Sequence, residues 1–144
     1  MIQNRKATVN DYEMIISLWE RSVMATHHFL SFKDKEEIKK ELPKYFPQLD
    51  VRLWYTEDSI IGFTAINGNH LEALFLDPDK IGIGYGKQIM QTCINRLGIT
   101  SVDVNKQNEN ATKFYLKSGF GIIGEDLTDG AGRPYPILHL SRLV

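Results

Sequence analysis

The stretch Leu71–Gly86, LEALFLDPDKIGIGYG, decides how this chain folds. Its apolar first half, residues 71–76, predicts a strand that ends at an Asp-Pro pair. The second half carries glycines at 82, 84 and 86 and leads directly into a helical pattern over residues 84–97. Glycine reaches positive φ and lets backbone N–H groups approach an anion. A strand, a glycine turn and a helix N-terminus therefore predict a phosphate site formed by the main chain.

Two better-known glycine motifs do not fit this turn. A P-loop ends in Gly-Lys-Ser/Thr, but Gln88 stands in place of the hydroxyl residue that binds magnesium, and Ile81 replaces the first glycine. A dinucleotide fingerprint needs a third glycine where this chain has Lys87. The triplet alone also fits a tight turn without any ligand, so both interpretations stay open.

Composition and charge place the chain among ordinary globular proteins. It has 144 residues, of which 42% are apolar, and a formal net charge of −1. This length is typical of one domain, 1–144. The chain has no excess of basic residues that would indicate a nucleic-acid partner. No apolar run approaches the ~20 residues of a membrane span, and we expect no secretory signal at the start. Because the single Cys93 excludes an internal disulfide, we expect a cytoplasmic domain with no nucleic-acid or membrane partner.

Periodicity and capping residues predict the remaining elements. Asn10 or Asp11 begins the first helix, Ser31 the second, and Asn108 a short late helix. Pro43 is expected to end the second helix at about residue 42. Strands are expected at residues 2–7, 51–56, 60–67, 70–76, 99–104, 120–124 and 136–143. The predicted fold class is mixed α/β (α+β), with one central sheet of about seven strands and about four helices.

Two runs of sequence carry a family resemblance. The first is LFLDPDKIGIGYG, residues 74–86, and the second is VN at 104–105 followed by NENATKFYLKSGF at 108–120. They resemble the acyl-CoA pyrophosphate motif and the second signature of the GNAT N-acetyltransferase superfamily. The opening RKAT, residues 5–8, is similar to the usual GNAT first strand, and PYP at 134–136 resembles small bacterial members. The resemblance covers essentially the whole chain.

The resemblance implies a fold, a reaction and a set of ligands. The fold is a mostly antiparallel twisted sheet with a splayed strand pair that forms the acyl-CoA cleft. The reaction is direct transfer of an acetyl group from acetyl-CoA, a co-substrate, to a primary amine in a ternary complex, without a metal. The acceptor is a small-molecule amine or a protein or peptide amine, and a homodimer is possible. The implied cofactor-binding residues are Leu74, Phe75, Leu76, Lys80, Ile81, Gly82, Ile83, Gly84, Tyr85, Gly86, Lys87, Asn105, Asn110 and Tyr115.

Ile81 departs from the family pattern. Relatives usually carry Arg or Gln at this position, so a side-chain contribution to the pyrophosphate site is lost or moved. Lys80 and Lys87 are the obvious substitutes. Because the main-chain donors survive, we expect weaker CoA affinity rather than none.

The reaction needs a neutral amine and a stabilised leaving group. A lysine-like amine has a pKa of ~10.4, so only about one molecule in 2500 is neutral at pH 7. His70 and Glu72 share one face of their strand, and His70 lies where some relatives carry a catalytic glutamate. A histidine suits proton removal near neutrality, although His70 equally fits a turn-end residue and Glu72 a surface carboxylate.

Tyr115 matches the tyrosine that relatives place beside the departing sulfur, and a core aromatic on a helical stripe is the alternative. We expect its hydroxyl to donate a hydrogen bond to the thiolate, while a backbone N–H near Leu76 meets the oxyanion. His27, His28 and Tyr135 come from segments that flank the acceptor side in similar proteins.

The remaining polar residues and the chain as a whole also have alternative roles. His139 is expected to be structural and Cys93 to lie in the core, and the spacing of histidines and cysteine predicts no metal site. A non-catalytic CoA-binding sensor or interaction module is the alternative function. A nucleotide hydrolase is disfavoured because the turn lacks the hydroxyl residue.

Overall fold

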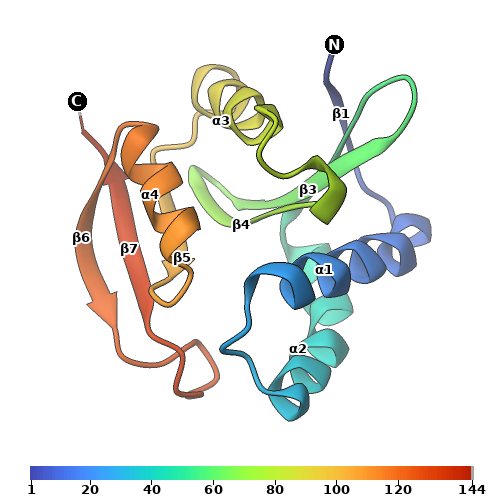
Figure 1. Cartoon of the computed structure of the whole chain (residues 1–144). Helices are drawn as coiled ribbons and strands as arrows, with labels where there is room; N and C mark the ends of the chain where they lie inside the picture. Colours follow the sequence, from blue (N-terminus) through green and yellow to red (C-terminus); the bar gives the residue numbers. More distant parts are fainter. Residues whose placement is uncertain (144) are drawn as a thin grey trace.

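A seven-stranded sheet with the strand order β1-β2-β3-β4-β5-β7-β6 forms the centre of the computed structural model, which describes residues 1–143 (Figure 1). The strands are β1 Gln3–Lys6, β2 Asp50–Tyr55, β3 Ile60–Asn67, β4 His70–Leu76, β5 Ser101–Asn105, β6 Phe120–Asp126 and β7 Ile137–Arg142. The α-helices are α1 Tyr12–Thr26, α2 Phe32–Tyr45, α3 Tyr85–Asn95 and α4 Glu109–Lys117. The expected mixed α/β fold, with its element order, is confirmed.

The sheet is antiparallel except where β4 meets β5. These two parallel strands pair only at His70↔Ser101 and Leu71↔Val102. Beside β3, the register of β4 passes from Leu71 to Ala73 over a single step of β3, so Glu72 is an extra residue. Such a bulge bends a strand and increases its twist. β4 therefore leaves β5 after two pairs, which confirms the expected splayed strand pair.

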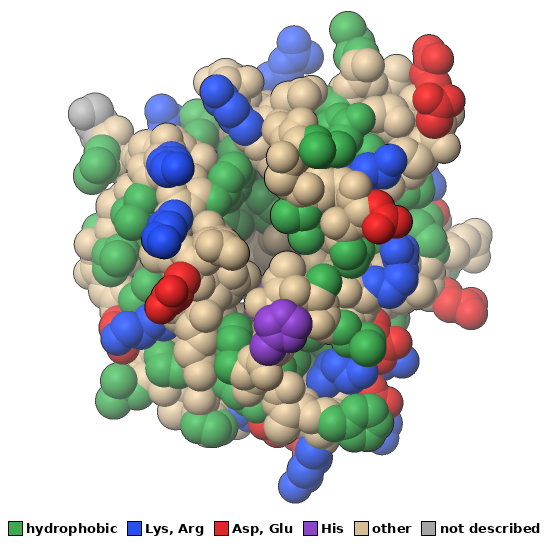
Figure 2. All heavy atoms as spheres, in the orientation of Figure 1, with side chains coloured by type: hydrophobic (Ala, Val, Ile, Leu, Met, Phe, Trp, Pro, Cys, Tyr) green, Lys and Arg blue, Asp and Glu red, His purple; other side chains and the backbone are tan. Residues whose placement is uncertain are grey.

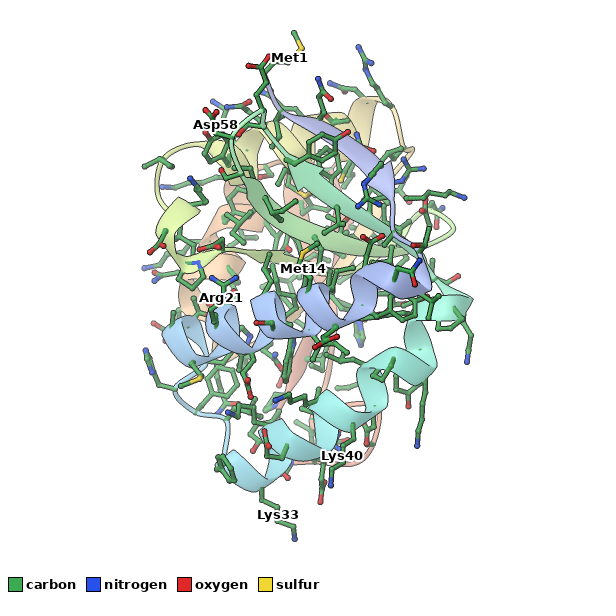
Figure 3. The ribbon with its side chains drawn as sticks, turned by 90° about the vertical axis from the view of Figure 1, so that its right-hand side faces the viewer. Met1, Met14, Arg21, Lys33, Lys40 and Asp58 are labelled. Atoms are coloured by element: carbon green, nitrogen blue, oxygen red, sulfur yellow. The ribbon has the colours of Figure 1, made fainter. Side chains whose placement is uncertain are left out.

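Apolar side chains form two buried clusters on the two faces of the sheet. Ile15, Leu18 and Trp19 of α1 pack against β2 and β3, while α3 and α4 belong to the second cluster with β4, β5 and β7. Figure 3 shows α1 lying across the sheet and α2 beyond it, with Lys33 and Lys40 directed outward. Cys93 is fully buried in the second cluster, which confirms it as a core residue, and this burial raises the pKa of its thiol to about 12.

Two predicted helix caps are present, and one predicted helix end is wrong. Ser31 Oγ accepts a hydrogen bond from the amide of Asp34 at 3.1 Å, and Asn108 Oδ1 accepts one from Ala111 at 3.2 Å. Pro43, however, lies inside α2, which continues to Tyr45. So close to the helix end, its missing N–H removes only one backbone bond. Packing of neighbouring apolar residues against the α1 cluster maintains the last turn.

Within the described residues, no helix combines the length and the apolar character that crossing a membrane requires.

Candidate active site

The separation of β4 from β5 opens a cleft of about 590 Å³. Its walls come from the end of α1, from β4, from the glycine turn before α3, from β5 and from α4. Figure 2 shows the hollow near the centre of the face seen in Figure 1. Both runs of sequence that carried the family resemblance therefore meet at one cavity.

The glycine turn presents backbone donors to one end of the cleft. Gly82 and Gly84 have φ values of 82° and 96°, and Gly84 caps the N-terminus of α3. Among residues 1–143, the amides of residues 82–87 donate no hydrogen bond to another residue, whereas Gln88 bonds Gly84 O at 3.3 Å. Unpaired amides at a helix start favour an anion. Lys87 also lines the cleft, whereas Lys80 does not.

The open edge of β4 forms the floor beyond this turn. Leu74, Phe75 and Leu76 all line the cleft and pair with β3 on one side only, because β5 has already diverged. An extended chain can pair with such an open strand edge. Ile81, Asn105 and the exposed Asn110 also line the cavity. The structure therefore brings most of the implied cofactor-binding residues together.

Tyr115 lies in the wall that α4 contributes. It is buried, with ring centroids 5.3 Å from Phe114 and 6.3 Å from Phe120, and it lines the cleft. Burial, with a smaller effect of Cys93, raises the pKa of Tyr115 above the ordinary phenol value. The hydroxyl therefore remains protonated at neutral pH. It has no hydrogen-bond partner among the described residues, and it is available as a donor.

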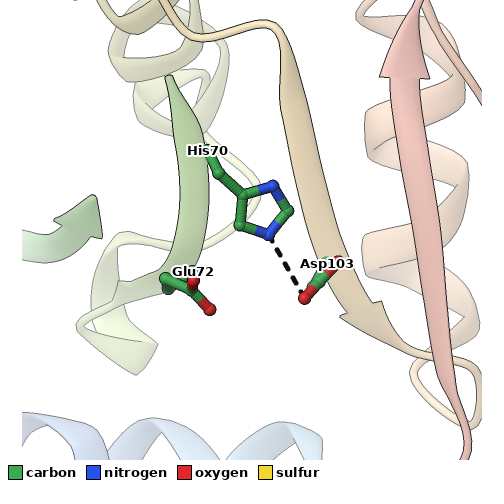
Figure 4. A group of neighbouring side chains, drawn as sticks. All are labelled: His70, Glu72 and Asp103. Carbon is green, nitrogen blue, oxygen red and sulfur yellow. Dashed lines mark ion pairs between the residues drawn. The ribbon is translucent and has the colours of Figure 1, made fainter. Parts of the chain in front are cut away.

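A polar cluster lies where β4 and β5 begin to separate. His70, Glu72 and Asp103 point toward one another from the two strands (Figure 4). His70 Nε2 lies 3.2 Å from Asp103 Oδ2, and His70 Nδ1 lies 2.6 Å from Ser101 Oγ. Glu72 and Asp103 line the cleft, but His70 does not. The carboxylates, rather than the expected imidazole, therefore face the cavity.

The same three side chains have a spacing that a metal ion could use. One ligand atom from each of His70, Glu72 and Asp103 lies within 4.8 Å of the others. The spacing of histidines and cysteine along the chain gives no sign that a carboxylate of β5 lies beside His70. The two hydrogen bonds of His70 already account for its position.

Asp103 also contacts a second histidine. Its Oδ1 lies 2.6 Å from His139 Nδ1, and His139 Nε2 lies 2.8 Å from Asp126 Oδ2. The hydrogen bond to Asp103, and after it the one to Asp126, raises the pKa of His139 above its ordinary value. Sequence reasoning missed Asp103. The alternation of residues 101–105, with Val102 and Val104 buried, was the available signal that Asp103 faces the other side.

Of the three residues expected on the acceptor side, two lie at the cleft and the third, Tyr135, does not. His27 and His28 line the cleft. Burial, followed by the charge of His28, lowers the pKa of His27 to about 4, so its imidazole is neutral at pH 7. Tyr135 does not line the cleft. Its hydroxyl donates to Asp34 and accepts from the Ser31 amide at 3.2 Å, so it fastens the loop before β7 to the start of α2.

Comparison with known proteins gives the family. The model of the acetyltransferase (GNAT) domain matches residues 13–132. The peptidyl-lysine N-acetyltransferase YjaB of Salmonella typhimurium is 36% identical over 141 residues, which are 97% of each chain.

Solved structures agree with this match. The solution structure of apo-form YjaB from Escherichia coli has a TM-score of 0.90 at 34% identity, over 99% of this chain and 98% of that one. The PaiA N-acetyltransferase of Thermoplasma acidophilum in complex with coenzyme A shares the fold, with a TM-score of 0.64 at 22% identity over 99% of each chain. This chain is a member of the GNAT acetyltransferase family, and thus an N-acetyltransferase.

Proposed function

We propose that this protein transfers an acetyl group from acetyl-CoA directly to a primary amine in a ternary complex, and that the amine is a lysine side chain of a protein or peptide. The YjaB relatives are named peptidyl-lysine N-acetyltransferases, which supports the acceptor class. The observation that carries the proposal is the cleft itself. It has unpaired amides at one end and Tyr115, Glu72 and Asp103 further along its walls.

The donor is bound by the main chain. The CoA diphosphate accepts hydrogen bonds from the amides of residues 82–87, assisted by Lys87, and the partial positive charge of the α3 N-terminus favours it. The pantetheine arm lies along the open edge of β4. A backbone N–H near Leu76 donates to the thioester oxygen as negative charge develops there. Asn105 and Asn110 hold the arm from the opposite wall.

The acceptor enters as an ammonium group beside Glu72 and Asp103. Glu72 accepts one proton from the ammonium group before attack, because only the neutral amine has a free electron pair, and passes it to solvent. The nitrogen then bonds to the carbonyl carbon, the carbon–sulfur bond breaks as CoA leaves as its thiolate, and the nitrogen gives its second proton to Glu72. Tyr115 donates a hydrogen bond to the departing thiolate. Its raised pKa makes full proton transfer to sulfur unfavourable, so the proposed role is hydrogen bonding.

The alternative is a CoA-binding module without catalysis. Two observations favour it: Ile81 supplies no polar group to the phosphate site, and both nitrogens of His70 already have partners. Such a protein binds CoA but acetylates no acceptor.

Tyr115→Phe separates the two functions. We expect kcat on a lysine peptide to fall about 10- to 100-fold, because a hydrogen bond to a developing charge is lost. The dissociation constant of CoA, measured by calorimetry, should change less than about twofold, because this hydrogen bond strengthens only as charge develops on sulfur. Tyr45→Phe, on the exposed side of α2, is the matched control. If the native protein binds CoA but acetylates no member of a panel of peptides and small amines, the result would instead support the non-catalytic CoA-binding module.

A further inference from the structure

A second cavity adjoins the cleft on its carboxylate side. It has a volume of about 450 Å³ and shares Glu72, Asp103 and Ile137 with the cleft. Its outer wall is formed by Asp126 at the end of β6 and by the loop that follows, residues 127–130. An acceptor whose amine reaches Glu72 and Asp103 therefore has its neighbouring atoms in this cavity. The reasoning rests on the proposed function, because it needs an acceptor at that place.

The cavity is negatively charged. Of the residues that the structure describes, those in its lining contribute the carboxylates of Glu72, Asp103, Asp126 and Asp129 and no lysine or arginine. The negative charge of Asp129 is compensated, because its Oδ2 lies 3.2 Å from the guanidinium of Arg133. Within the described structure the other three carboxylates pair with no lysine or arginine; Asp103 and Asp126 contact the imidazole of His139, and Asp103 also contacts that of His70.

The wall of the cavity is held in place before any acceptor arrives. Asp129 Oδ1 accepts hydrogen bonds from the amides of Ala131 at 3.0 Å and Arg133 at 2.8 Å. The Arg133 guanidinium reaches across to Glu41 of α2 at 2.8 Å. The loop is thereby fastened to α2, and little ordering of the protein opposes binding.

We propose that Asp126 determines acceptor specificity, so that the enzyme prefers an acceptor with a second positive charge next to the amine that is acetylated. The side chain of Asp126 is 70% exposed, at the outer wall of the cavity, where it meets the part of the acceptor beyond the reacting amine. Two acceptors offer this chemistry: a peptide with a basic residue beside its lysine, and a polyamine.

His139 makes the preference depend on pH. Its ring faces Asp103 of β5 and Asp126 of β6, while Glu72 of β4 and Asp129 line the same cavity and His70 holds the other oxygen of Asp103. As the pH rises and the imidazolium of His139 loses its proton, the cavity gains one net negative charge. The preference for a doubly charged acceptor therefore increases with pH.

The test compares acceptors that differ in one charge. Three peptides of one sequence, each with a single lysine, carry Arg, Gln or Glu beside it, and spermidine is compared with butylamine. The ratio of kcat/KM between the Arg and Gln peptides should be about threefold to fivefold and should fall in high salt. A ratio is used because most of the pH dependence that the reacting amine shows in every peptide cancels in it.

Asp126→Asn should bring this ratio close to one. Glu125→Gln is the control, since Glu125 is a neighbouring carboxylate of β6 that pairs with Lys106 at 3.1 Å and does not line the cavity. His139→Gln should remove the pH dependence of the ratio. A preference confined to the peptides, or to spermidine, identifies the source of the second charge.

The proposal would be overturned if, in the native enzyme, kcat/KM were nearly equal within both pairs, the Arg and Gln peptides and spermidine and butylamine. An unchanged ratio in Asp126→Asn would also overturn it. Either result would leave the proposed function intact. Failure to acetylate any acceptor, with CoA still bound, would overturn both.

Discussion

Gly84 shows how one residue serves both the fold and the site. Its φ of 96° belongs to the left-handed region, which L-residues with a side chain adopt at a cost of about 1–2 kcal/mol. An added Cβ would meet no atom within 4 Å, so the protein itself leaves the space above this backbone open. That space lies at the cleft, beside the unpaired amides.

Gly84→Ala should therefore weaken CoA binding more than it weakens the fold. We expect the dissociation constant of CoA, measured by calorimetry, to rise at least about tenfold, because a methyl group blocks close approach of the diphosphate. Gly68→Ala is the control: Gly68 also has positive φ and open space around it, but it does not line the cleft. Both variants should lose similar stability in urea. Equal CoA affinity in both would contradict the placement of the diphosphate.

His27 should make the protein sensitive to acid. Its pKa is about 4 in the folded chain and about 6.5 when unfolded, so below pH 6.5 the unfolded state binds a proton that the folded state does not. The free energy of unfolding should therefore fall by about 3 kcal/mol between pH 7 and pH 4 from this group alone. Urea titrations at several pH values should show a shallower acid loss in His27→Gln, and a much smaller change in the exposed control His28→Gln, because the charge of His28 is the lesser cause of the lowered pKa. Identical pH profiles in His27→Gln and the native protein would contradict this account.

At the scale of elements, β4 controls the site. Its bulge at Glu72 ends the pairing with β5, and its far end lies very close to β3. A Cβ on Gly62 of β3 would stand 2.3 Å from the carbonyl oxygen of Phe75, a contact with backbone that cannot swing away. Gly62 therefore permits the approach of β3 that fixes the open edge of β4.

Gly62→Ala should lower the free energy of unfolding by about 2 kcal/mol, because the two strands must move apart. Chemical denaturation measures the change, and CoA affinity should fall with it as the β4 edge shifts. In the control Gly124→Ala on β6, the new Cβ would meet only His139 Cδ2 at 3.8 Å, an ordinary contact. Equal effects of the two substitutions would show that the approach of β3 to β4 is not limiting.

At the scale of the whole molecule, the cleft separates charges of opposite sign. Unpaired amides and Lys87 lie at one part of the cleft, and Glu72 and Asp103 lie at another. The net charge of −1 conceals this division. An anionic donor and a cationic acceptor are thereby drawn to different parts of one cavity, which leaves the two substrates room to be bound together.

Local signals predicted much of the fold. Ser31 and Asn108 cap their helices as expected, because a capping bond joins residues only three apart. The hairpin of β2 and β3 and the strand His70–Leu76 also lie where the apolar runs and the turns between them predict strands. Pro43 did not end α2, since packing of the last turn outweighed one missing hydrogen bond.

The sequence by itself determined the strand, the glycine turn and the helix start of the anion site, because positive φ and unpaired amides are properties of a few consecutive residues. Only the tertiary structure decided what faces the cavity beyond it. Asp103 meets His70 and His139 across strands that are more than 30 residues away in the chain. Such contacts depend on strand order, register and a single extra residue at Glu72, and a shift of one residue would turn each side chain to the opposite face.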